Sequence, residues 1–460
     1  MKVTAAVILA AGKGTRMKSG LLKVMHPLGG YPMISWPVRA ALAVGSARTV
    51  IVIGYQGDKV REYLAGARDI SFAMQAEQLG TGHAVACAAP FLMGSADQVL
   101  VLCGDVPLIR SATLQAMLSS HEASQATLTV LTARLENPHG YGRVVKGSDG
   151  RVLRIVEEKD ATAEEKDIDE INTGIYCVEA EFLFDSVFGL ENDNFQEEYY
   201  LTDIVKKGAD EGRLCQSFAL TDVEEVMGVN DRVQLAAAGK ILRRRINEKL
   251  MLSGVTIIDP ETAYIEDGVE VGMDTLIHPN VHISGPTSIG TDCVIEPSVV
   301  IRGCRIGNGV IVKAGTVMSD SILHDSVTVG PMAHLRPGSE LKDHVKIGNF
   351  VETKKVILGE GSKASHLTYL GDAAIGTNVN IGCGTITCNY DGVKKHRTII
   401  EDDVFVGSDV QFVAPVTIGR NSLVAAGTTV TRDVPPDSLA IARTQQVNKE
   451  GWKLRKKSSE

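Results

Sequence analysis

The stretch LAAGKGTRM, residues 9–17, places a glycine-rich loop and cationic side chains directly after an apolar run. Glycines let backbone N–H groups close around phosphate oxygens, while Arg16 and, a few residues on, Lys23 add positive charge. The loop is not a Walker A motif, because Val7 stands where that motif requires glycine, and it does not match G-x-G-x-x-G. The stretch therefore predicts a phosphate site of another kind, with a plain strand-to-helix turn as the alternative.

Further polar residues follow apolar runs of the first half. In VLCGDVPL, Asp105 comes directly after a predicted buried strand, where α/β proteins place ligands, although a lone Gly-Asp there would also suit a helix cap. In QAEQLGTGHA, the amide of Gln75 can match the imide edge of uracil, and Gly80 and Thr81 form a second small loop. The stretches NPHGYGRV, IVEEKD, EINTGIY and GVNDR continue the series with Gly142, Glu157, Asn172 and Asn230.

A second polar cluster lies between residues 348 and 398. Its members are His366 and Tyr369 in HLTY and Asn389 and Tyr390 in NYDG, preceded by Arg336 and Lys354. A histidine that titrates near neutral pH can take a proton from a reacting group. The cluster therefore predicts His366 as a general base, with Asn389 orienting its ring and two cations suited to an anionic substrate. For His366 alone, a surface or hydrogen-bonded histidine is the simpler interpretation.

Two cysteines, Cys383 and Cys388, lie close to His366 in sequence. They leave open a route through a covalent intermediate on a cysteine. Direct transfer is favoured, because nothing nearby in sequence marks either residue as an activated thiolate.

Strand-like and helix-like stretches alternate along the first half of the chain, and they would position its polar residues. AAVILAA, TVIVIGY and QVLVLCGD are continuous apolar runs, typical of parallel strands covered on both faces, and helix-like stretches at 33–45 and 82–93 separate them. They predict an α/β, Rossmann-like nucleotide-binding domain over residues 1–230. Residues 231–252 contain no proline and carry Lys240 and the triplet Arg243, Arg244 and Arg245, which predicts one exposed helix as a linker over 231–253.

After Gly254 the apolar pattern changes to a period of six. Aliphatic residues stand at 265, 271, 277, 283, 289, 295 and 301, resume at Val329 and return at Ile400, so 348–398 reads as an interruption. Period six is neither helical nor that of a flat strand, and it predicts a repeat array. Each hexapeptide would make one short strand and one turn, three would complete a circuit, and glycine, asparagine and aspartate would form the corners.

Length and composition limit the classes of function. A chain of 460 residues is too long for one ordinary core, and its net charge of −9 argues against a nucleic-acid or membrane-surface partner. No apolar run is long enough to span a bilayer, and residues 3–11 fit a buried strand better than a signal peptide. The eight scattered cysteines indicate buried free thiols in a reducing cytoplasm.

In this order, the motifs resemble the sugar-phosphate nucleotidyltransferases. Joined to a hexapeptide array, they resemble the bacterial bifunctional N-acetylglucosamine-1-phosphate uridyltransferase and glucosamine-1-phosphate acetyltransferase family over nearly the whole chain. The resemblance implies a left-handed parallel β-helix acetyltransferase domain over 254–460, forming a homotrimer in the cytoplasm. Its activities would acetylate glucosamine-1-phosphate with acetyl-CoA and then convert the product and UTP into UDP-N-acetylglucosamine for cell-wall and lipopolysaccharide precursors.

The resemblance also assigns roles to residues of the first half. It implies that Asp105 and Asn230 hold Mg²⁺ and that Arg16 and Lys23 stabilise the leaving pyrophosphate. The uridine contacts it implies are Gln75, Gly80 and Thr81, and the N-acetylglucosamine contacts are Gly142, Glu157 and Asn172.

For the second half, the resemblance implies two groups of contacts. The sugar phosphate would meet Arg336, Lys354, Tyr369 and Asn380. Acetyl-CoA would meet Asn389, Tyr390, Ser408, Ala426 and Arg443, partly across a subunit boundary. Two alternatives remain: a nucleotidyltransferase with a purely regulatory β-helix, and a β-helix that serves only as a trimerisation scaffold in a larger assembly. Both predict an uninterrupted coil without the polar cluster around His366.

Overall fold

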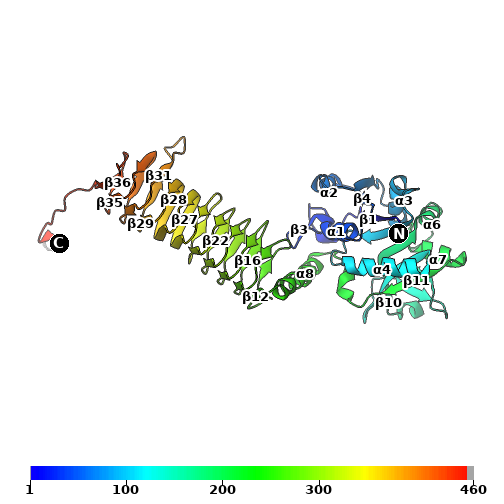
Figure 1. Cartoon of the computed structure of the whole chain (residues 1–460). Helices are drawn as coiled ribbons and strands as arrows, with labels where there is room; N and C mark the ends of the chain where they lie inside the picture. The colour runs from blue at the N-terminus through cyan, green and yellow to red at the C-terminus, as the bar shows by residue number, and fades with distance from the viewer. Residues whose placement is uncertain (1, 453–460) are drawn as a thin grey trace, which may run out of the picture. The chain divides into compact units, whose positions relative to one another are not determined.

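The computed structural model describes residues 2–452, so the last residues of the predicted C-terminal domain lie outside it. The chain divides into two compact units, Met1–Leu242 and Arg243–Glu460 (Figure 1). Within the described residues, no helix is both long enough and apolar enough to cross a membrane.

The N-terminal unit is built on a mixed sheet with the strand order β11-β7-β10-β6-β1-β4-β5, and the β8–β9 hairpin pairs through β8 with β10. The strands are β1 (Thr4–Ala10), β4 (Arg48–Ile53), β5 (Ile70–Met74), β6 (Gln98–Cys103), β7 (Leu128–Arg134), β8 (Arg143–Lys146), β9 (Val152–Val156), β10 (Glu170–Glu179) and β11 (Cys215–Ala219). Strands β6, β1, β4 and β5 run parallel, so their carboxyl ends share one edge. The three apolar runs of the sequence correspond to β1, β4 and β6, which confirms them as buried strands.

Helices cover both faces of this sheet. They are α1 (Ser35–Ala43), α2 (Asp58–Leu64), α3 (Thr81–Leu92), α4 (Ser111–Ser124), α5 (Ala163–Lys166), α6 (Ala180–Val187) and α7 (Asp203–Asp210). Alternate residues of β1 enter different cores: Val7 lies in one core with residues such as Val85 of α3 and Leu183 of α6, whereas Ile8 lies in another with Leu114 of α4. A strand buried on both faces needs apolar residues throughout, which explains the unbroken run.

A single helix, α8 (Arg232–Leu252), occupies the predicted linker. The helix is not exposed throughout, because Leu242 and Leu250 are buried while Val233 and Leu252 face solvent. The boundary between the two units falls within it. In its second half, the buried Asn247 donates from Nδ2 to the carbonyl oxygens of Pro260 and Ala263, at 2.8 and 2.9 Å, and so joins the helix to the first coil of the repeats.

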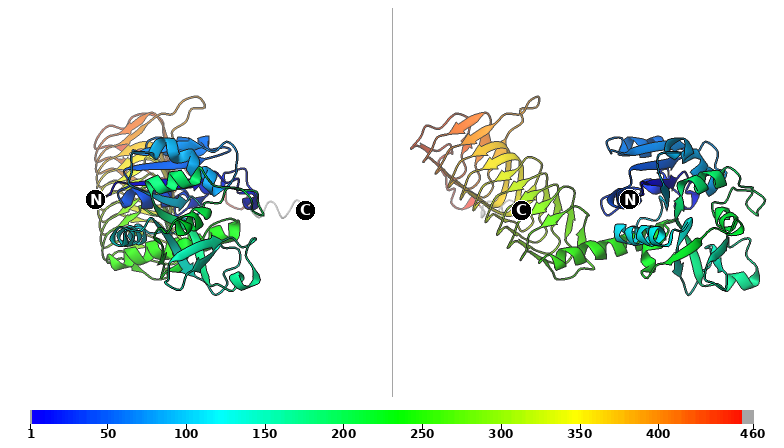
Figure 2. Two further views of the ribbon diagram at one scale, coloured as in Figure 1. Left: turned by 90° about the vertical axis from the view of Figure 1, so that its right-hand side faces the viewer. Right: turned by 45° about the vertical axis from the view of Figure 1, so that its right-hand side comes forward.

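The C-terminal unit is a parallel β-helix (Figures 1 and 2). Most strands pair with the third strand along the chain, as when Tyr264 pairs with His282 and Ile277 with Ile295, each eighteen residues later. Three hexapeptides therefore complete one circuit, as predicted. The buried Ile265, Ile277 and Ile295 belong to one continuous interior stack.

The strands of the β-helix are short except for two. Their bounds are β12 (Thr256–Ile257), β13 (Tyr264–Ile265), β14 (Glu270–Val271), β15 (Leu276–Ile277), β16 (His282–Ser284), β17 (Ser288–Ile289), β18 (Val294–Ile295), β19 (Val300–Arg302), β20 (Arg305–Ile306), β21 (Ile311–Val312), β22 (Val317–Ser319), β23 (Ile322–Leu323), β24 (Thr328–Val329), β25 (His334–Leu335), β26 (Glu340–Leu341), β27 (Lys346–Leu358), β28 (Lys363–Ile375), β29 (Asn380–Ile381), β30 (Ile386–Cys388), β31 (Thr398–Ile400), β32 (Phe405–Val406), β33 (Gln411–Val413), β34 (Val416–Ile418), β35 (Leu423–Val424), β36 (Thr429–Val430) and β37 (Leu439–Ala440).

The interruption predicted between residues 348 and 398 is wrong for most of that stretch. The long strands β27 and β28 lie side by side through it, and the buried Thr353, Ala364 and Thr387 take inward positions. Threonine and alanine replace the aliphatic residues there, which hid the period. Between β30 and β31, residues 389–397 form a loop with the bridge Tyr390–Lys395. The coil therefore continues, and the sequence signal had only weakened.

The corners of the coil place non-glycine residues in the left-handed region. Asp274 and Asn280 have φ of 61° and 60°, as expected for residues that tolerate this conformation. Met332, Phe350 and Leu367 also have positive φ, although their bulky side chains disfavour it. All three are more than half exposed. Strained backbone beneath exposed apolar side chains marks this corner as unusual.

Candidate active sites

Four predicted residues of the first half meet at the carboxyl edge of β1 and β6. Lys23 Nζ lies 2.5 Å from Asp105 Oδ2 and 3.2 Å from Asn230 Oδ1. Arg16 donates from Nη2 to the same amide oxygen at 3.1 Å. The backbone N–H of Val229 donates to the carbonyl of Asp105 at 2.8 Å, which fixes the GVN segment against the end of β6.

The glycine-rich loop brings the cations this close. Gly14 has φ of 61°, and a Cβ on it would lie 2.5 Å from Cβ of Lys23. Any side chain at position 14 would therefore push away the segment that carries Lys23, which starts the short 3₁₀ helix Lys23–Met25. The glycine is required by the close approach as well as by its backbone conformation.

The oxygens of Asp105 and Asn230 suit Mg²⁺. Both already face one cation, the Lys23 ammonium, so they converge on a single point. Within residues 2–452, no group of three or more carboxylate, histidine or cysteine side chains stands ready to hold a metal. One carboxylate and one amide oxygen fit Mg²⁺, which usually keeps several waters and takes further ligands from substrate phosphates.

Gln75 lies at the end of β5, on the same edge of the sheet. Its side chain is only 4% exposed, and its backbone N–H donates to the carbonyl of Ile53 at the end of β4. The side-chain nitrogen lies 3.0 Å from the carbonyl oxygen of Gly80 and 3.1 Å from Nδ1 of His83. Gln78 in the same loop donates to the carbonyl of Ala11, just after β1.

The loop at Gly80 and Thr81 is fixed by a distant segment of the chain. Gly80 has φ of 107°, and a Cβ on it would come within 2.6 Å of the carbonyl oxygen of Tyr199. The hydroxyl oxygen of Thr81 accepts from the backbone N–H of Leu201 at 3.0 Å. The predicted uridine residues thus lie together at the start of α3.

Gly142, Glu157 and Asn172 form a third group. The backbone N–H of Asn172 donates to the carbonyl of Gly142 at 2.8 Å, and a Cβ on Gly142 would lie 3.4 Å from Glu157 Oε1. Burial raises the pKa of Glu157, and the carboxylates of Asp160 and Asp203 raise it further. Glu157 borders a pocket of about 280 Å³.

Sequence reasoning missed a residue that orients this third group. The buried Tyr176 of β10 donates from its hydroxyl to Asn172 Oδ1 at 3.0 Å. That oxygen also accepts the backbone N–H of Gly174 at 3.0 Å, so the amide nitrogen of Asn172 is left to face outward. Burial holds the pKa of Tyr176 well above its usual value, so its hydroxyl keeps its proton and remains a donor.

In the β-helix, pairing of the long strands builds the second site. Asn349 of β27 lies opposite His366 of β28, and its Oδ1 is 3.1 Å from Nδ1 of the ring. The prediction that Asn389 orients this ring is wrong, because Asn389 donates from Nδ2 to Asp372 at 2.5 Å. The ring's partner is set by the pairing of strands in adjacent coils, and this pairing cannot be read from the sequence.

Cationic side chains gather around Glu352 and Lys354 of β27. Arg336 Nη1 lies 2.8 Å from Glu352 Oε1, which pairs across the strands with Tyr369. The pKa of Lys354 is lowered, first by a hydrogen bond with Lys395, then by the charges of Lys395 and Arg336. Like charges in contact indicate a site shaped for an anion. The sequence analysis did not select Lys395, although its basic surroundings, KKHR, were a signal.

The loop that carries Lys395 has an internal frame. The carboxylate of Asp391 accepts from the backbone N–H groups of Val393 and Lys394, at 2.8 and 2.6 Å, and lies 2.6 Å from His396 Nε2. These bonds hold the pKa of Asp391 far below its usual value. A pocket of about 350 Å³ adjoins the loop, and its lining includes Lys395, His396 and Asp372.

Three of the predicted acetyl-CoA residues lie together on later coils. Arg443 donates from Nη1 to the carbonyl of Ala426 at 3.0 Å. The backbone N–H of Gly427, which follows Ala426, donates to the carbonyl of Ser408 at 2.8 Å. Tyr390 instead lies in the loop, and Asn380 pairs with Phe405 between β29 and β32. In the described part of this single chain, no hydrogen bond links Ser408, Ala426 or Arg443 to His366.

The cysteines confirm only part of their prediction. All eight are free thiols, and four of them, including Cys293 and Cys304 of the β-helix, are buried. Cys383 is exposed and Cys388 is half-buried, so the expectation of buried thiols is wrong for Cys383. Burial raises the pKa of Cys103, beside Asp105, to about 12.

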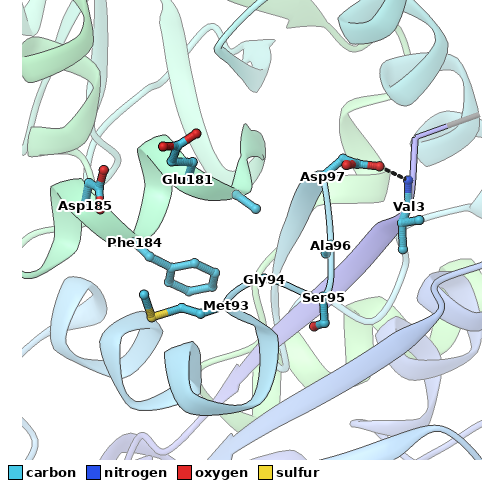
Figure 3. A pocket seen from close by; sticks show the side chains of 10 residues that line it. Val3, Met93, Gly94, Ser95, Ala96, Asp97, Glu181, Phe184 and Asp185 are labelled. Atoms are coloured by element: carbon cyan, nitrogen blue, oxygen red, sulfur yellow. Dashed lines mark hydrogen bonds between the residues drawn. The ribbon is translucent and has the colours of Figure 1, made fainter.

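A further pocket of about 510 Å³ lies at the opposite edge of the N-terminal sheet (Figure 3). Its lining comes from the segment before β6 and from α6, and includes Met93, Phe184 and Asp185. Asp97 there accepts from the backbone N–H of Val3 at 2.6 Å. None of the predicted site residues lines this pocket.

Fold and sites define a nucleotidyltransferase domain joined to a hexapeptide-repeat transferase domain. Residues 5–224 match the family described as nucleotidyl transferase. Residues 268–303 and 397–432 match the family described as bacterial transferase hexapeptide, six repeats.

Similarity to known proteins extends over the whole chain. A bifunctional protein GlmU of Geotalea uraniireducens is 69% identical over 457 residues, which covers 99% of this chain and 100% of that protein. The proteins of the same name from Pelobacter propionicus and Shouchella clausii are 65% and 48% identical, over 99% and 97% of this chain and 99% and 98% of theirs. The chain belongs to the family of bifunctional GlmU proteins. It is a bifunctional enzyme of UDP-N-acetylglucosamine synthesis, with a uridyltransferase and an acetyltransferase domain.

Proposed function

We propose that the two sites work in sequence within this enzyme. The β-helix site acetylates glucosamine-1-phosphate with acetyl-CoA, and the N-terminal site joins the product to UTP and releases pyrophosphate. The observation that supports this most is the convergence of Arg16, Lys23, Asp105 and Asn230 on one point of the sheet edge.

In the N-terminal site, a phosphate oxygen of N-acetylglucosamine-1-phosphate attacks the α-phosphorus of UTP, and the bond to pyrophosphate breaks. The attacking phosphate is already anionic, so the protein needs to position reactants and neutralise charge rather than remove a proton. Asp105 and Asn230 would hold Mg²⁺, which supplies part of that neutralisation when bound. Lys23 and Arg16 then turn from these oxygens to the leaving pyrophosphate.

The sugar and the base bind at the two other groups of residues. Gly142 leaves room beside Glu157, whose carboxylate accepts from sugar hydroxyls, and Asn172 presents its amide nitrogen. Gln75, Gly80 and Thr81 hold the uridine. All three groups lie in the N-terminal unit.

In the β-helix site, His366 acts as the general base. Asn349 Oδ1 accepts from Nδ1–H, so Nε2 is free to take the proton as the amine attacks the thioester carbonyl. The C–N bond forms, the C–S bond breaks, and CoA leaves as its thiol. Arg336, Lys354 and Lys395 hold the sugar phosphate, and direct transfer needs neither Cys383 nor Cys388.

The acetyl-CoA site is completed by a neighbouring chain in a homotrimer. Ser408, Ala426 and Arg443 lie on coils beyond the His366 cluster, and the exposed Met332, Phe350 and Leu367 form an apolar corner next to His366. Exposed apolar patches of this kind mark interfaces, and three copies can bury them around one axis. Sedimentation should give a trimer, and a fully active monomer would contradict this part of the proposal.

The enzyme acts in the cytoplasm on small molecules, with no nucleic-acid partner and no stable membrane insertion, and feeds cell-wall and lipopolysaccharide precursors. The free thiols and the two co-substrates, UTP and acetyl-CoA, support this location. The polar cluster argues against a β-helix that only regulates or assembles, even though the coil continues through most of residues 348–398.

The decisive experiment incubates the full chain with glucosamine-1-phosphate, acetyl-CoA, UTP and Mg²⁺. Omitting UTP should leave N-acetylglucosamine-1-phosphate as the end product, and omitting acetyl-CoA should leave no uridyl acceptor. Chelating Mg²⁺ should stop only the second reaction. Formation of UDP-glucosamine at a similar rate without acetyl-CoA would contradict the proposed order.

A further inference from the structure

We propose that His83 is a positioning residue that locks the amide of Gln75 with its oxygen toward the nucleotide base. Through this lock, His83 contributes to the preference for uracil over cytosine. The inference rests on the proposed UTP site, and it adds a residue that the sequence analysis did not select.

The hydrogen bonds of Gln75 carry the argument. Its Nε2 is 3.0 Å from the carbonyl oxygen of Gly80 and 3.1 Å from Nδ1 of His83, so both amide hydrogens have acceptors. Within residues 2–452, Oε1 accepts from no protein donor. The amide is therefore anchored by its nitrogen and presents its oxygen.

The reversed amide is excluded by its surroundings. Turning the group around would place Oε1 against the carbonyl oxygen of Gly80, and two acceptors facing each other repel. The observed orientation also fixes the tautomer of His83, because Nδ1 must accept and Nε2 must then carry the proton. Cys87, one turn further along α3, places its sulfur 3.8 Å from Nε2, where it can act as a weak acceptor. Burial raises the pKa of Cys87, so this group stays a neutral thiol.

Burial makes the lock strong. The side chain of Gln75 is 4% exposed, so a hydrogen that lost its acceptor would find little water to replace it. Gln75 would then rotate to satisfy that hydrogen, and its oxygen would lose its direction. Gly80 alone holds the amide at one hydrogen, whereas Gly80 and His83 together hold it at both.

The presented oxygen distinguishes the two pyrimidines. Uracil offers the N3–H donor, which Oε1 can accept, whereas N3 of cytosine is an acceptor and would face Oε1 without a proton between them. Sites built to hydrogen-bond a substrate N–H reject an analogue lacking it, because their own buried polar group is left unpaired. Gln75 lies at the end of β5, and Gln78 of its loop donates to the carbonyl of Ala11 beside the phosphate loop. The base-reading oxygen therefore lies at the edge of the sheet that carries the phosphate site.

The test measures kcat/KM of the full chain for UTP and for CTP, with N-acetylglucosamine-1-phosphate and Mg²⁺ fixed. His83→Ala should lower the ratio of kcat/KM for UTP to kcat/KM for CTP about tenfold or more, because a buried amide hydrogen of Gln75 loses its acceptor. A tenfold change in this ratio corresponds to about 1.4 kcal/mol. His83→Asn can place an amide oxygen near the position of Nδ1 and should restore most of the ratio. His83→Gln reaches the position of Nε2 instead and should not restore it.

Acetylation by the same chain serves as the control for enzyme concentration, because it uses the other unit. If His83→Ala and His83→Gln slow both nucleotides equally and leave the ratio unchanged, the lock is wrong and His83 is only structural. If His83→Ala does not fold, the contrast between the Asn and Gln variants still decides. A wild-type chain without uridyl transfer would instead overturn the proposed function itself.

Discussion

The two candidate sites hold their cations in opposite ways. In the N-terminal site, Lys23 and Arg16 rest on the oxygens of Asp105 and Asn230, so their charge already has partners. In the β-helix site, Lys354 lies beside Lys395, and the pKa of Lys354 is lowered first by a hydrogen bond with Lys395 and then by the like charge of that residue. The first site therefore holds its cations against oxygen atoms, whereas the second brings two cationic side chains together.

The two sites also differ in how the chain assembles them. Residues of the first site come from segments up to 214 positions apart that meet where parallel strands end. Residues of the second come from neighbouring coils and the loop at 389–397, and pairing along β27 and β28 sets Asn349 opposite His366. The loops at a sheet edge can vary independently of one another. In a coil, by contrast, the strand register determines which residues lie opposite each other. Substitutions should therefore separate the two chemistries cleanly.

The largest effect should follow from Asp105→Asn. Losing the carboxylate removes the only charged oxygen of the Asp105–Asn230 pair, so uridyl transfer should be abolished while acetylation continues at its normal rate. Separate steady-state assays of the two half-reactions measure this. Near-normal uridyl transfer by the variant would remove Asp105 from the metal site.

His366→Ala should give the next largest effect. A general base typically contributes about 10²–10⁴-fold, so the acetylation rate should fall by that factor while uridyl transfer stays unchanged. The coil should still form, because His366 is on the surface and outside the interior stack. Cys383→Ala is the matched control and should acetylate nearly normally. A normal rate in His366→Ala, or none in Cys383→Ala, would contradict direct transfer with a histidine base.

A smaller effect is expected from Lys395→Met. Removing one cation should raise KM for glucosamine-1-phosphate several-fold with little change in kcat, and the pKa of Lys354 should return toward its usual value. A lysine binds anions while protonated, so affinity is present below its pKa and is lost as pH rises through it. In the wild type, with the lowered pKa, this loss should begin at lower pH than in the variant. Equal profiles of KM against pH would argue against the cluster.

The smallest change is expected from Asn349→Asp, which sharpens the assignment of the ring's partner. A carboxylate beside Nδ1 favours the protonated imidazole and should raise the pKa of His366. The base works only in its neutral form, so the acid limb of the acetylation profile should move to higher pH. Asn389→Ala should not move this limb, since Asn389 bonds to Asp372. If the acid limb moves in Asn389→Ala but not in Asn349→Asp, Asn389 and not Asn349 orients the ring of His366.

The sequence alone predicted those strands and coils in which one kind of side chain recurs for a single structural reason. Apolar runs identified β1, β4 and β6 because a strand covered on both faces tolerates little else. The six-residue period identified the coil until Thr353, Ala364 and Thr387 replaced aliphatic residues, since the inside of a coil accepts any small side chain whose polar atom is bonded. Thr387, for example, donates to the carbonyl of Gly371 at 3.0 Å.

The partners of the candidate catalytic groups depend on strand register, which the sequence left undetermined. A circuit of eighteen residues would place Gly348 opposite His366, but this circuit is one residue shorter and places Asn349 there. In the N-terminal unit, the hydrogen bond between Gln75 and His83 depends on how the loop after β5 returns to α3. Spacing alone carries neither contact, although it did identify the residue types at both sites.

The three-sided circuit also sets which changes in length the β-helix can accept. Removing one whole circuit from the coils before β25, as between Ile277 and Ile295, would leave every later residue on its original side and shorten the stack by about 4.8 Å, one strand spacing. Removing a single hexapeptide would instead turn everything after it by a third of a revolution. His366 would then keep its neighbours in β27, but the whole group would lie on a different side of the three-sided coil relative to the coils before the deletion. Natural variation in the length of this domain should therefore come in steps of about eighteen residues rather than six.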